Sequence, residues 1–408
     1  MKFLYFHQHF STPEGATGIR SYEMAKAMVA KGHKVTMVCG SYQGGNTGLK
    51  QPFINGQRRG HVDGIEVIEF ELNYANAQSF SQRSLTFLKF AYRSVKISLT
   101  HDYDAIFATT TPLTAAIPGI IARWFKGKTF IFEVRDLWPE LPKAMGVIKN
   151  PVVLLMMSVL EWLAYKSAHG HIGLAPGIVT GITKHLSQQN KVALIPNGCD
   201  LSIFANTNEA INIKGINDDD FVAVFSGTHG KANGLHALLP VAQYLQKHQY
   251  QQIKILLIGQ GQLKAELIEQ AKQLSLNNII FHDAVDKHTL AKILQRADVG
   301  LQILANIPAF YYGTSPNKFF DYLSAGLPVV NNYPGWVAEL IEQYQCGIAV
   351  APEHSEALAS ALIELAQNPT QKQKFGQNAQ RLAQRKFNRE DLAKQWVEYV
   401  EQVVATHD

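Results

Sequence analysis

The hydrophobic positions of this chain form short apolar runs that alternate with segments of helical periodicity. In the first half, the runs KFLYFH, KVTMVC, GIEVIEF, YDAIFA and TFIFEV have the length of β-strands, and shorter runs follow at 170–174 and 192–195. Between several of them, apolar residues recur every three or four positions, as along residues 19–31. Strands that alternate with helices predict a parallel, doubly wound sheet.

The same alternation restarts after a weakly patterned polar stretch at 201–220, which we interpret as a linker. Apolar runs follow at 221–226, 253–258, 278–282, 298–303, 329–330 and 347–350, and the chain ends in helical patterns near 355–366 and 389–405. A chain of 408 residues is long enough for two such domains. We therefore predict an α/β protein of two Rossmann-like domains, residues 1–205 and 206–385, facing each other across a deep cleft suited to a ligand.

The segment YGTSPNKFFDYLSAGLPVV, residues 312–330, carries the strongest functional signal. A Gly/Ser/Thr loop opens a short helix beside Lys318, and such a loop with a lysine suits a phosphate. Asp321, about one turn further, could accept hydrogen bonds from a ribose. The segment therefore predicts a nucleotide site, far from the first strand where a dinucleotide-binding fold would place it.

Two further glycine loops stand at the first strand-to-helix turn of each predicted domain. Loop 13–20 (PEGATGIR) lets backbone approach a ligand, and loop 227–231 (GTHGK) adds His229 as a hydrogen-bond donor and Lys231 as a cation. The turn at 259–261 begins like a dinucleotide fingerprint, but lysine replaces its third glycine. Each loop alone also fits an ordinary turn, and together they favour a nucleotide site.

The segment RDLWPE, residues 135–140, follows a buried strand at its C-terminal end. In an open α/β sheet this position faces the ligand crevice. A carboxylate there could orient a sugar hydroxyl or accept a proton, whereas a salt-bridged loop with a packed tryptophan is the structural alternative.

Charge is unevenly distributed between the two halves. Residues 1–205 carry 21 Lys and Arg against 13 Asp and Glu, and the remainder carries 17 against 20. A basic first half favours an anionic partner such as a membrane surface or a phosphorylated substrate, while the absence of a reading motif argues against nucleic acid. Three scattered cysteines and two DxD patterns without a fitting context predict no disulfide and no metal.

Two segments suit a membrane surface, although no run reaches the ~18–20 apolar residues of a membrane span. Residues 81–100 combine basic and aromatic side chains without an acidic residue, and residues 151–165 (PVVLLMMSVLEWLAY) are almost wholly apolar. A core-facing helix is the alternative for each, and we favour it for the second. With no signal-peptide pattern at the start, we expect a cytoplasmic protein, with peripheral contact to the inner membrane surface as an option.

The order of these motifs resembles the retaining glycosyltransferases of family 4. The resemblance runs from PEGATGIR and GHKVTMV through RDLWPE, IPNGCD, FSGTHGKANGL and IGQGQL to SPNKFFDYLSAGLPVV, and the DLWPE form is most similar to bacterial enzymes that extend lipid-linked surface-polysaccharide precursors. It implies the GT-B fold, a metal-independent hexosyl transfer from a nucleotide-sugar donor such as a UDP-sugar to a lipid-linked or saccharide acceptor, and no cofactor. It also implies that the final helix, residues 386–408, returns to the first domain.

The resemblance assigns roles to individual residues. It implies that Lys231 and Lys318 hold the donor diphosphate, that Asp321 replaces a ribose-binding glutamate, and that Asp136 touches the donor sugar or the acceptor. The expected set comprises catalytic Asp136, Lys231 and Lys318; donor-binding Gly15, Thr17, Gly18, Arg20, Gly227, His229, Gly259, Ser315, Asn317 and Asp321; and acceptor-side Arg135, Trp138 and Glu140.

Two positions depart from the family pattern. The family has two glutamates with seven residues between them, and this chain has Gly313 and Asp321 instead. His229 stands where an arginine is usual. A nucleotide-sugar 2-epimerase and a catalytically silent nucleotide-sugar-binding protein are therefore alternatives, whereas an NAD oxidoreductase lacks its fingerprint.

Overall fold

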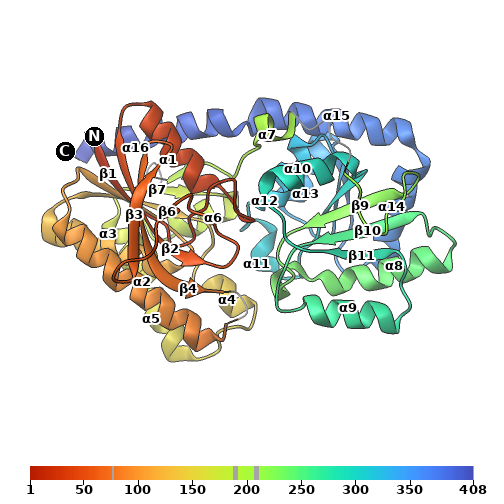
Figure 1. The fold of residues 1–408 in the computed structure, drawn as a ribbon, viewed down its shortest axis with the longest axis horizontal. Helices are drawn as coiled ribbons and strands as arrows, with labels where there is room; N and C mark the ends of the chain where they lie inside the picture. Colours follow the sequence, from red (N-terminus) through yellow and green to blue (C-terminus); the bar gives the residue numbers. More distant parts are fainter. Residues whose placement is uncertain (76–77, 187–191, 206–210, 408) are drawn as a thin grey trace. The chain divides into compact units, whose positions relative to one another are not determined.

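The computed structural model describes residues 1–75, 78–186, 192–205 and 211–407. The chain forms two compact units (Figure 1). Unit 1 comprises Met1–Asn197, Tyr312–Ser315 and Glu390–Asp408, and unit 2 comprises Gly198–Tyr311 and Pro316–Arg389. The boundary that we predicted at 205/206 touches residues 206–210, which lie outside the described residues.

Unit 1 contains an eight-stranded sheet in the order β3-β4-β2-β1-β5-β6-β7-β8. All neighbours are parallel except β3 and β4. The strands are β1 (Lys2–Phe6), β2 (Lys34–Tyr42), β3 (Gln57–Val62), β4 (Ile65–Tyr74), β5 (Ala105–Thr109), β6 (Thr129–Val134), β7 (Gly170–Gly173) and β8 (Val192–Leu194). β1 is buried from Phe3 onward because helices cover both faces of the sheet, which explains its continuous apolar run.

The helices of unit 1 form two layers (Figure 1). α1 (Arg20–Ala30) and α16 (Arg389–His407) cover one face, and α2 (Phe80–Thr100), α3 (Ile117–Lys126) and α5 (Pro151–Ser167) cover the other. The short helices α4 (Glu140–Ala144) and α6 (Pro176–Thr183) complete the unit. None of the helices in the described part of the chain has the length and apolar character needed to cross a bilayer.

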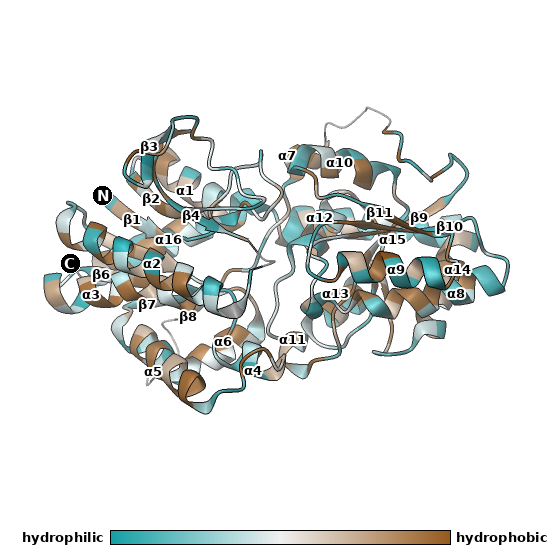
Figure 2. Ribbon diagram, turned by 60° about the horizontal axis from the view of Figure 1, so that its bottom comes forward, coloured by the Kyte–Doolittle hydropathy of each residue, from teal (hydrophilic) through white to brown (hydrophobic). Residues whose placement is uncertain are grey.

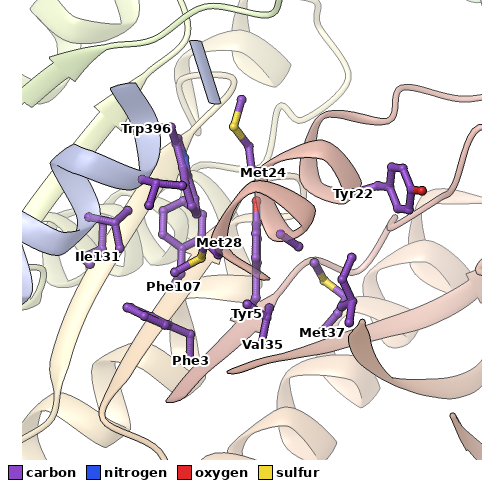
Figure 3. Packing of buried hydrophobic residues seen from close by; sticks show 14 of the residues in the cluster. Phe3, Tyr5, Tyr22, Met24, Met28, Val35, Met37, Phe107, Ile131 and Trp396 are labelled. Carbon is purple, nitrogen blue, oxygen red and sulfur yellow. The ribbon is translucent and has the colours of Figure 1, made fainter. Parts of the chain in front are cut away.

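Helix α16 brings the end of the chain into the core of unit 1. Its Trp396 is completely buried, stacks on Tyr5 at a ring-centroid distance of 5.9 Å and lies 4.5 Å from the ring of Phe107 (Figure 3). Met24 and Met28 of α1 fill the same cluster. The C-terminal helix is therefore an integral part of this core.

Unit 2 contains a six-stranded sheet in the order β11-β10-β9-β12-β13-β14, and every recorded strand pair is parallel. The strands are β9 (Phe221–Ser226), β10 (Ile253–Ile258), β11 (Ile279–His282), β12 (Val299–Gln302), β13 (Val329–Asn331) and β14 (Gly347–Ala349). The helices are α7 (Leu201–Ala205), α8 (Leu238–Lys247), α9 (Lys264–Gln273), α10 (Lys287–Arg296), α11 (Pro308–Tyr311), α12 (Asn317–Ser324), α13 (Trp336–Tyr344), α14 (Ser355–Gln367) and α15 (Pro369–Lys386). Two sheets whose strands are parallel except for the β3–β4 pair confirm the predicted α/β class.

Candidate functional site

Two loops at the carboxyl ends of β9 and β10 pack backbone against backbone in unit 2. Gly227 N donates to Ile258 O and His229 N donates to Gln260 O, each at 2.9 Å. A Cβ atom at Gly259 would lie 1.9 Å from Gly227 O, so no larger residue fits there. This close approach accounts for the glycines of both turns. Gly227 itself is exposed at the carboxyl ends of the strands, where open α/β folds bind ligands.

Lys318 lies against the loop that follows β9. Its Nζ donates to Asn233 Oδ1 at 2.9 Å and lies 4.8 Å from the centre of the Phe225 ring, and its Cε lies 3.1 Å from the position of a Cβ at Gly227. Burial lowers the pKa of Lys318 to about 8, and the Asp321 carboxylate acts in the opposite direction. The surroundings thus disfavour the charge of this ammonium, and an arriving anion would stabilise it.

The start of α12 adds a second feature that favours an anion. Its first residue is Asn317, which is exposed, and its N-cap residue Pro316 supplies no side-chain cap. A helix N-terminus attracts negative charge through its N–H groups and dipole. Lys231 is exposed two residues before Asn233, the partner of Lys318. One edge of unit 2 therefore gathers Gly227, Lys231, Gly259, Asn317 and Lys318.

The predicted role of His229 as a hydrogen-bond donor to a ligand is revised, because its side chain points into the protein. The residue is 0% exposed, and its ring lies 6.2 Å from the Phe225 ring and 6.4 Å from the Phe281 ring. Burial and nearby Lys264 lower the pKa of His229 to about 4, against a weaker opposing effect of the Ile258 carbonyl. The imidazole lies beside the rings of Phe225 and Phe281, and neither of its nitrogens has a hydrogen-bond partner among the described residues.

The predicted role of Asp321 in binding a ribose is also revised, since its carboxylate belongs to a buried ionic cluster. It accepts a hydrogen bond from Lys287 Nζ, which lies 3.3 Å from Asp200 Oδ2 as well. Arg389 Nη2 donates to Asp200 Oδ2 at 3.2 Å and to Gly198 O at 2.6 Å. Burial raises the pKa of Asp321 more strongly than Lys287 lowers it. A ribose would have to compete with this buried pairing for Asp321, whose residue is 4% exposed.

In unit 1, Arg20 forms a buried ion pair and is not available to a donor in this structure. Its Nη2 lies 2.9 Å from Glu133 Oε2, and its guanidinium also donates to the carbonyls of Ile195 and Pro196. Trp396 Nε1 donates to the same Glu133 oxygen at 3.2 Å. Burial opposes ionisation of Glu133, but Arg20 and Arg135 outweigh it and lower its pKa. The predicted donor contact of Arg20 is therefore replaced by a role in the core.

The RDLWPE segment lies at the carboxyl end of β6, as the sequence predicted for a ligand-facing loop. Asp136 is half-buried and accepts from Thr111 Oγ1 at 3.2 Å, and burial raises the pKa of Asp136. Arg135 donates to Thr109 Oγ1 and Ser21 Oγ. Trp138 is half-buried and Glu140 is exposed. Asp136 is thus a partly desolvated carboxylate suited to a sugar hydroxyl.

Three polar residues that we did not predict as site residues, His7, Gln8 and His9, directly follow β1. His9 Nδ1 hydrogen-bonds to Thr111 O at 3.1 Å, so the same threonine links His9 and Asp136. His9 Nε2, His7 Nδ1 and both amide atoms of Gln8 are buried and have no hydrogen-bond partner among the described residues. Burial lowers the pKa of His9 to about 4. The only signal in the sequence was the density of polar residues in HQH directly after an apolar run.

The glycine loop of unit 1 is held by a second loop. Ala16 N donates to Gly44 O at 2.8 Å, and Thr17 Oγ1 and Tyr42 OH lie 2.6 Å apart. A Cβ at Gly15 would lie 2.2 Å from Ser11 Oγ, so close packing alone requires this glycine. Gly18 is half-buried.

Ser315 groups with unit 1 as well. Its hydroxyl accepts from Asn197 N at 2.9 Å, and Asn197 Nδ2 donates to Ser315 O at 2.6 Å. The predicted donor-binding residues are therefore distributed over both units.

Metal ligands do not gather anywhere in the described part of the chain. Within residues 1–75, 78–186, 192–205 and 211–407, no group of three or more His, Cys, Asp or Glu side chains is arranged to hold an ion. Asp102 of the first DxD pattern instead pairs with Lys2, and Asp104 accepts from Lys2 N.

Comparisons with known proteins match both parts of the chain. Residues 15–198 match the family described as glycosyl transferase 4-like domain, and residues 206–382 match glycosyl transferases group 1. The O-antigen chain mannosyltransferase C of Escherichia coli is 20% identical over 255 residues, which are 62% of this chain and 65% of that protein. The chain therefore matches less than two thirds of this relative.

Solved structures show the same fold over nearly the whole chain. Sucrose-phosphate synthase from Thermosynechococcus elongatus aligns with a TM-score of 0.77 and 17% identity, covering 99% of each chain. Anabaena HepE, solved in complex with UDP-glucose, aligns with a TM-score of 0.69 and 18% identity, covering 98% of this chain and all of that one. With both domain families matched in order and this fold shared, the chain belongs to the glycosyltransferases of the GT-B fold, and it resembles an enzyme that acts on the O-antigen chain.

Proposed function

We propose that this protein is a retaining glycosyltransferase that moves a sugar from a UDP-sugar to a lipid-linked or saccharide acceptor during bacterial surface-polysaccharide synthesis. The observation that carries the proposal is Lys318, a partly desolvated lysine at an uncapped helix start beside a glycine-lined sheet edge. Each of these features favours a diphosphate. The UDP-glucose complex of HepE and the O-antigen role of the E. coli relative support the donor and acceptor classes.

In the proposed reaction, cationic groups of the chain stabilise the departing nucleoside diphosphate. Lys318, Lys231 and the N-terminus of α12 supply positive charge and N–H donors where the leaving group gains negative charge. Asp136 orients a hydroxyl of the sugar or acceptor, and the acceptor attacks from the side of the leaving group, so the anomeric configuration is retained. Because these groups provide the electrostatic stabilisation, the proposal includes no metal ion and no cofactor.

The proposed location follows from the proposed acceptor. An enzyme that elongates a lipid-linked saccharide with a nucleotide sugar works where both occur, at the cytoplasmic face of the membrane. We therefore place this protein there as a peripheral protein.

A thermal-shift screen followed by a transfer assay tests the proposal. A ligand present at 100 times its Kd stabilises the folded state by about 2.7 kcal/mol, so UDP should raise the melting temperature clearly, and GDP and ADP should raise it less. Product formation from labelled UDP-sugars and a panel of lipid-linked saccharides then tests transfer, and NMR of the product tests retention. No shift with any nucleotide contradicts the site, and a shift without turnover supports the silent binding protein instead.

Lys318→Ala provides the residue-level test of the same proposal. Removing one charge-stabilising donor should lower turnover by about 10²-fold or more. Lys247→Ala, an exposed lysine at the end of α8, serves as the matched control and should keep normal turnover. Near-normal turnover of Lys318→Ala would refute the role of this lysine.

A further inference from the structure

Large apolar side chains are exposed almost entirely on unit 1. Of the 18 that the structure records as exposed, twelve lie on α2, α3 and α5, whereas only Leu274 lies in unit 2. We call this layer of three helices the α2–α3–α5 surface. Its exposed apolar residues are Leu85, Leu88, Tyr92, Leu99, Trp124, Phe125, Val152, Leu155, Met156, Val159, Trp162 and Leu163.

Helix α5 reverses our expectation that residues 151–165 face the core. Its buried residues Glu161, Ala164, Tyr165 and Ser167 form the inner side, while its exposed apolar residues recur every three or four positions from 152 to 163. They form a single stripe along a 17-residue helix about 25 Å long. Figure 2 shows the apolar character of α5. A solvent-facing side of a helix is normally polar, so this face calls for a partner.

The three helices form one continuous layer. α3 packs against both α2 and α5. Trp124 Nε1 at the end of α3 donates to Ser167 Oγ of α5 at 2.9 Å, and Lys126 Nζ donates to His101 O, just after α2, at 3.2 Å. The exposed rings of Trp124 and Phe125 therefore stand where the C-terminal ends of the helices meet.

The charges of this layer are almost all positive. The three helices carry seven Lys and Arg, and their one acidic residue, Glu161, is 8% exposed and accepts from Tyr165 OH at 2.9 Å. Exposed Lys149 and Lys166 flank the apolar stripe of α5. Apolar and aromatic side chains surrounded by cations suit the interface of an anionic lipid bilayer.

We propose that the α2–α3–α5 surface docks this protein on an anionic lipid bilayer, with the outer stripe of α5 and the Trp124–Phe125 pair at the lipid interface. The inference rests on the proposed function in one respect, namely that a lipid-linked acceptor explains why the enzyme binds a membrane. A second copy of the chain would bring two basic layers together, whereas an anionic bilayer neutralises them. Charge therefore favours the bilayer as the occupant.

Vesicle flotation of the full chain tests this docking. Binding to vesicles of phosphatidylcholine with about one third phosphatidylglycerol should exceed binding to phosphatidylcholine alone and should weaken with salt. Lys149→Glu with Lys166→Glu should weaken binding about tenfold or more, because each lysine near the surface contributes about fivefold. Leu155→Gln with Trp162→Gln should weaken it to a similar extent through lost apolar contact.

Controls and a second readout keep the outcomes distinct. Lys247→Glu and Leu274→Gln change exposed residues of unit 2 and should leave flotation unchanged. Equal flotation of all variants, or none by the wild type, overturns the docking surface, and a concentration-dependent dimer that the α5 variants abolish assigns it to a second copy. UDP-induced thermal shifts, measured without vesicles, report on the nucleotide site alone. A failure of the proposed nucleotide site can therefore be distinguished from a failure of the proposed membrane docking.

Discussion

The protonation of Lys318 predicts how nucleotide affinity depends on pH. Burial lowers the pKa of Lys318 to about 8, so about 90% of molecules carry the ammonium at pH 7 and about 10% at pH 9. A diphosphate binds the charged form, and binding in turn raises the pKa of the lysine. Because the neutral form predominates above pH 8, the apparent Kd of UDP should rise about tenfold from pH 7 to pH 9.

Isothermal titration calorimetry of UDP from pH 7 to pH 9 measures this slope. Lys318→Arg keeps a cation that stays charged throughout, so its Kd should vary little over the same range. Lys318→Met should bind more weakly at pH 7 and also lose the slope. Lys231→Arg, at an exposed position nearby, should keep the wild-type slope. A slope that persists in both Lys318 variants would refute the reasoning, as would a flat profile in the wild type.

Three further predictions concern the cores and can be measured by urea denaturation. Trp396→Ala should lower the free energy of unfolding by about 3–5 kcal/mol because it empties the site between α16 and the sheet, and Trp396→Phe should lower it less; equal effects would contradict this packing. Arg20→Met should lower it by about 3–5 kcal/mol because Glu133 is left buried without this partner, and Arg20→Met with Glu133→Gln should recover part of the loss; no recovery would contradict the pairing. His229 should contribute up to about 3 kcal/mol to the fall in stability from pH 6.5 to pH 4, because the unfolded chain binds a proton at this histidine that the folded form does not, and His229→Phe should reduce the fall by this contribution; a pH profile unchanged by the substitution would contradict the burial of the ring.

The sequence predicted elements whose apolar pattern is strong and missed those whose pattern is weak. Strand β6 was predicted at its observed bounds, since all six residues are buried. Strand β3 (QRRGHV) was missed because it is a polar edge strand that pairs only with β4. Helix α15 was missed because its apolar positions are sparse, with four small or apolar residues buried among 18.

Whether a site residue could be predicted depends on how far apart in the sequence its interacting partners lie. Gly227 and Lys318 could be proposed as a site because glycine turns and a lysine at a helix start are local patterns. The pairing of Arg20 with Glu133, 113 positions away, leaves no local pattern, and neither does the inward rotation of the His229 ring. Conversely, α5 looks like a core helix in sequence, and only the fold shows which of its sides lacks cover.

Asp321 provides a test in which the family pattern and the structure predict opposite results. The resemblance led us to expect a ribose-binding glutamate there, so Asp321→Glu would restore the usual residue and should strengthen UDP binding if the carboxylate reaches the ribose. In the structure, Asp321 and Lys287 pair in a buried cluster with Asp200 and Arg389, close to the chain positions where unit 2 begins and ends.

An extra methylene in such a packed site costs about 1–3 kcal/mol, because the carboxylate and its partners must shift together. We therefore expect Asp321→Glu to lower the free energy of unfolding by this amount without tightening UDP binding, and Asp321→Asn, which leaves Lys287 with only Asp200, to lower it further. Urea denaturation and calorimetry on the same samples separate the two readings. An Asp321→Glu variant that is as stable as the wild type and binds UDP more tightly would show that this carboxylate faces the nucleotide, and the buried cluster would then not hold it in solution.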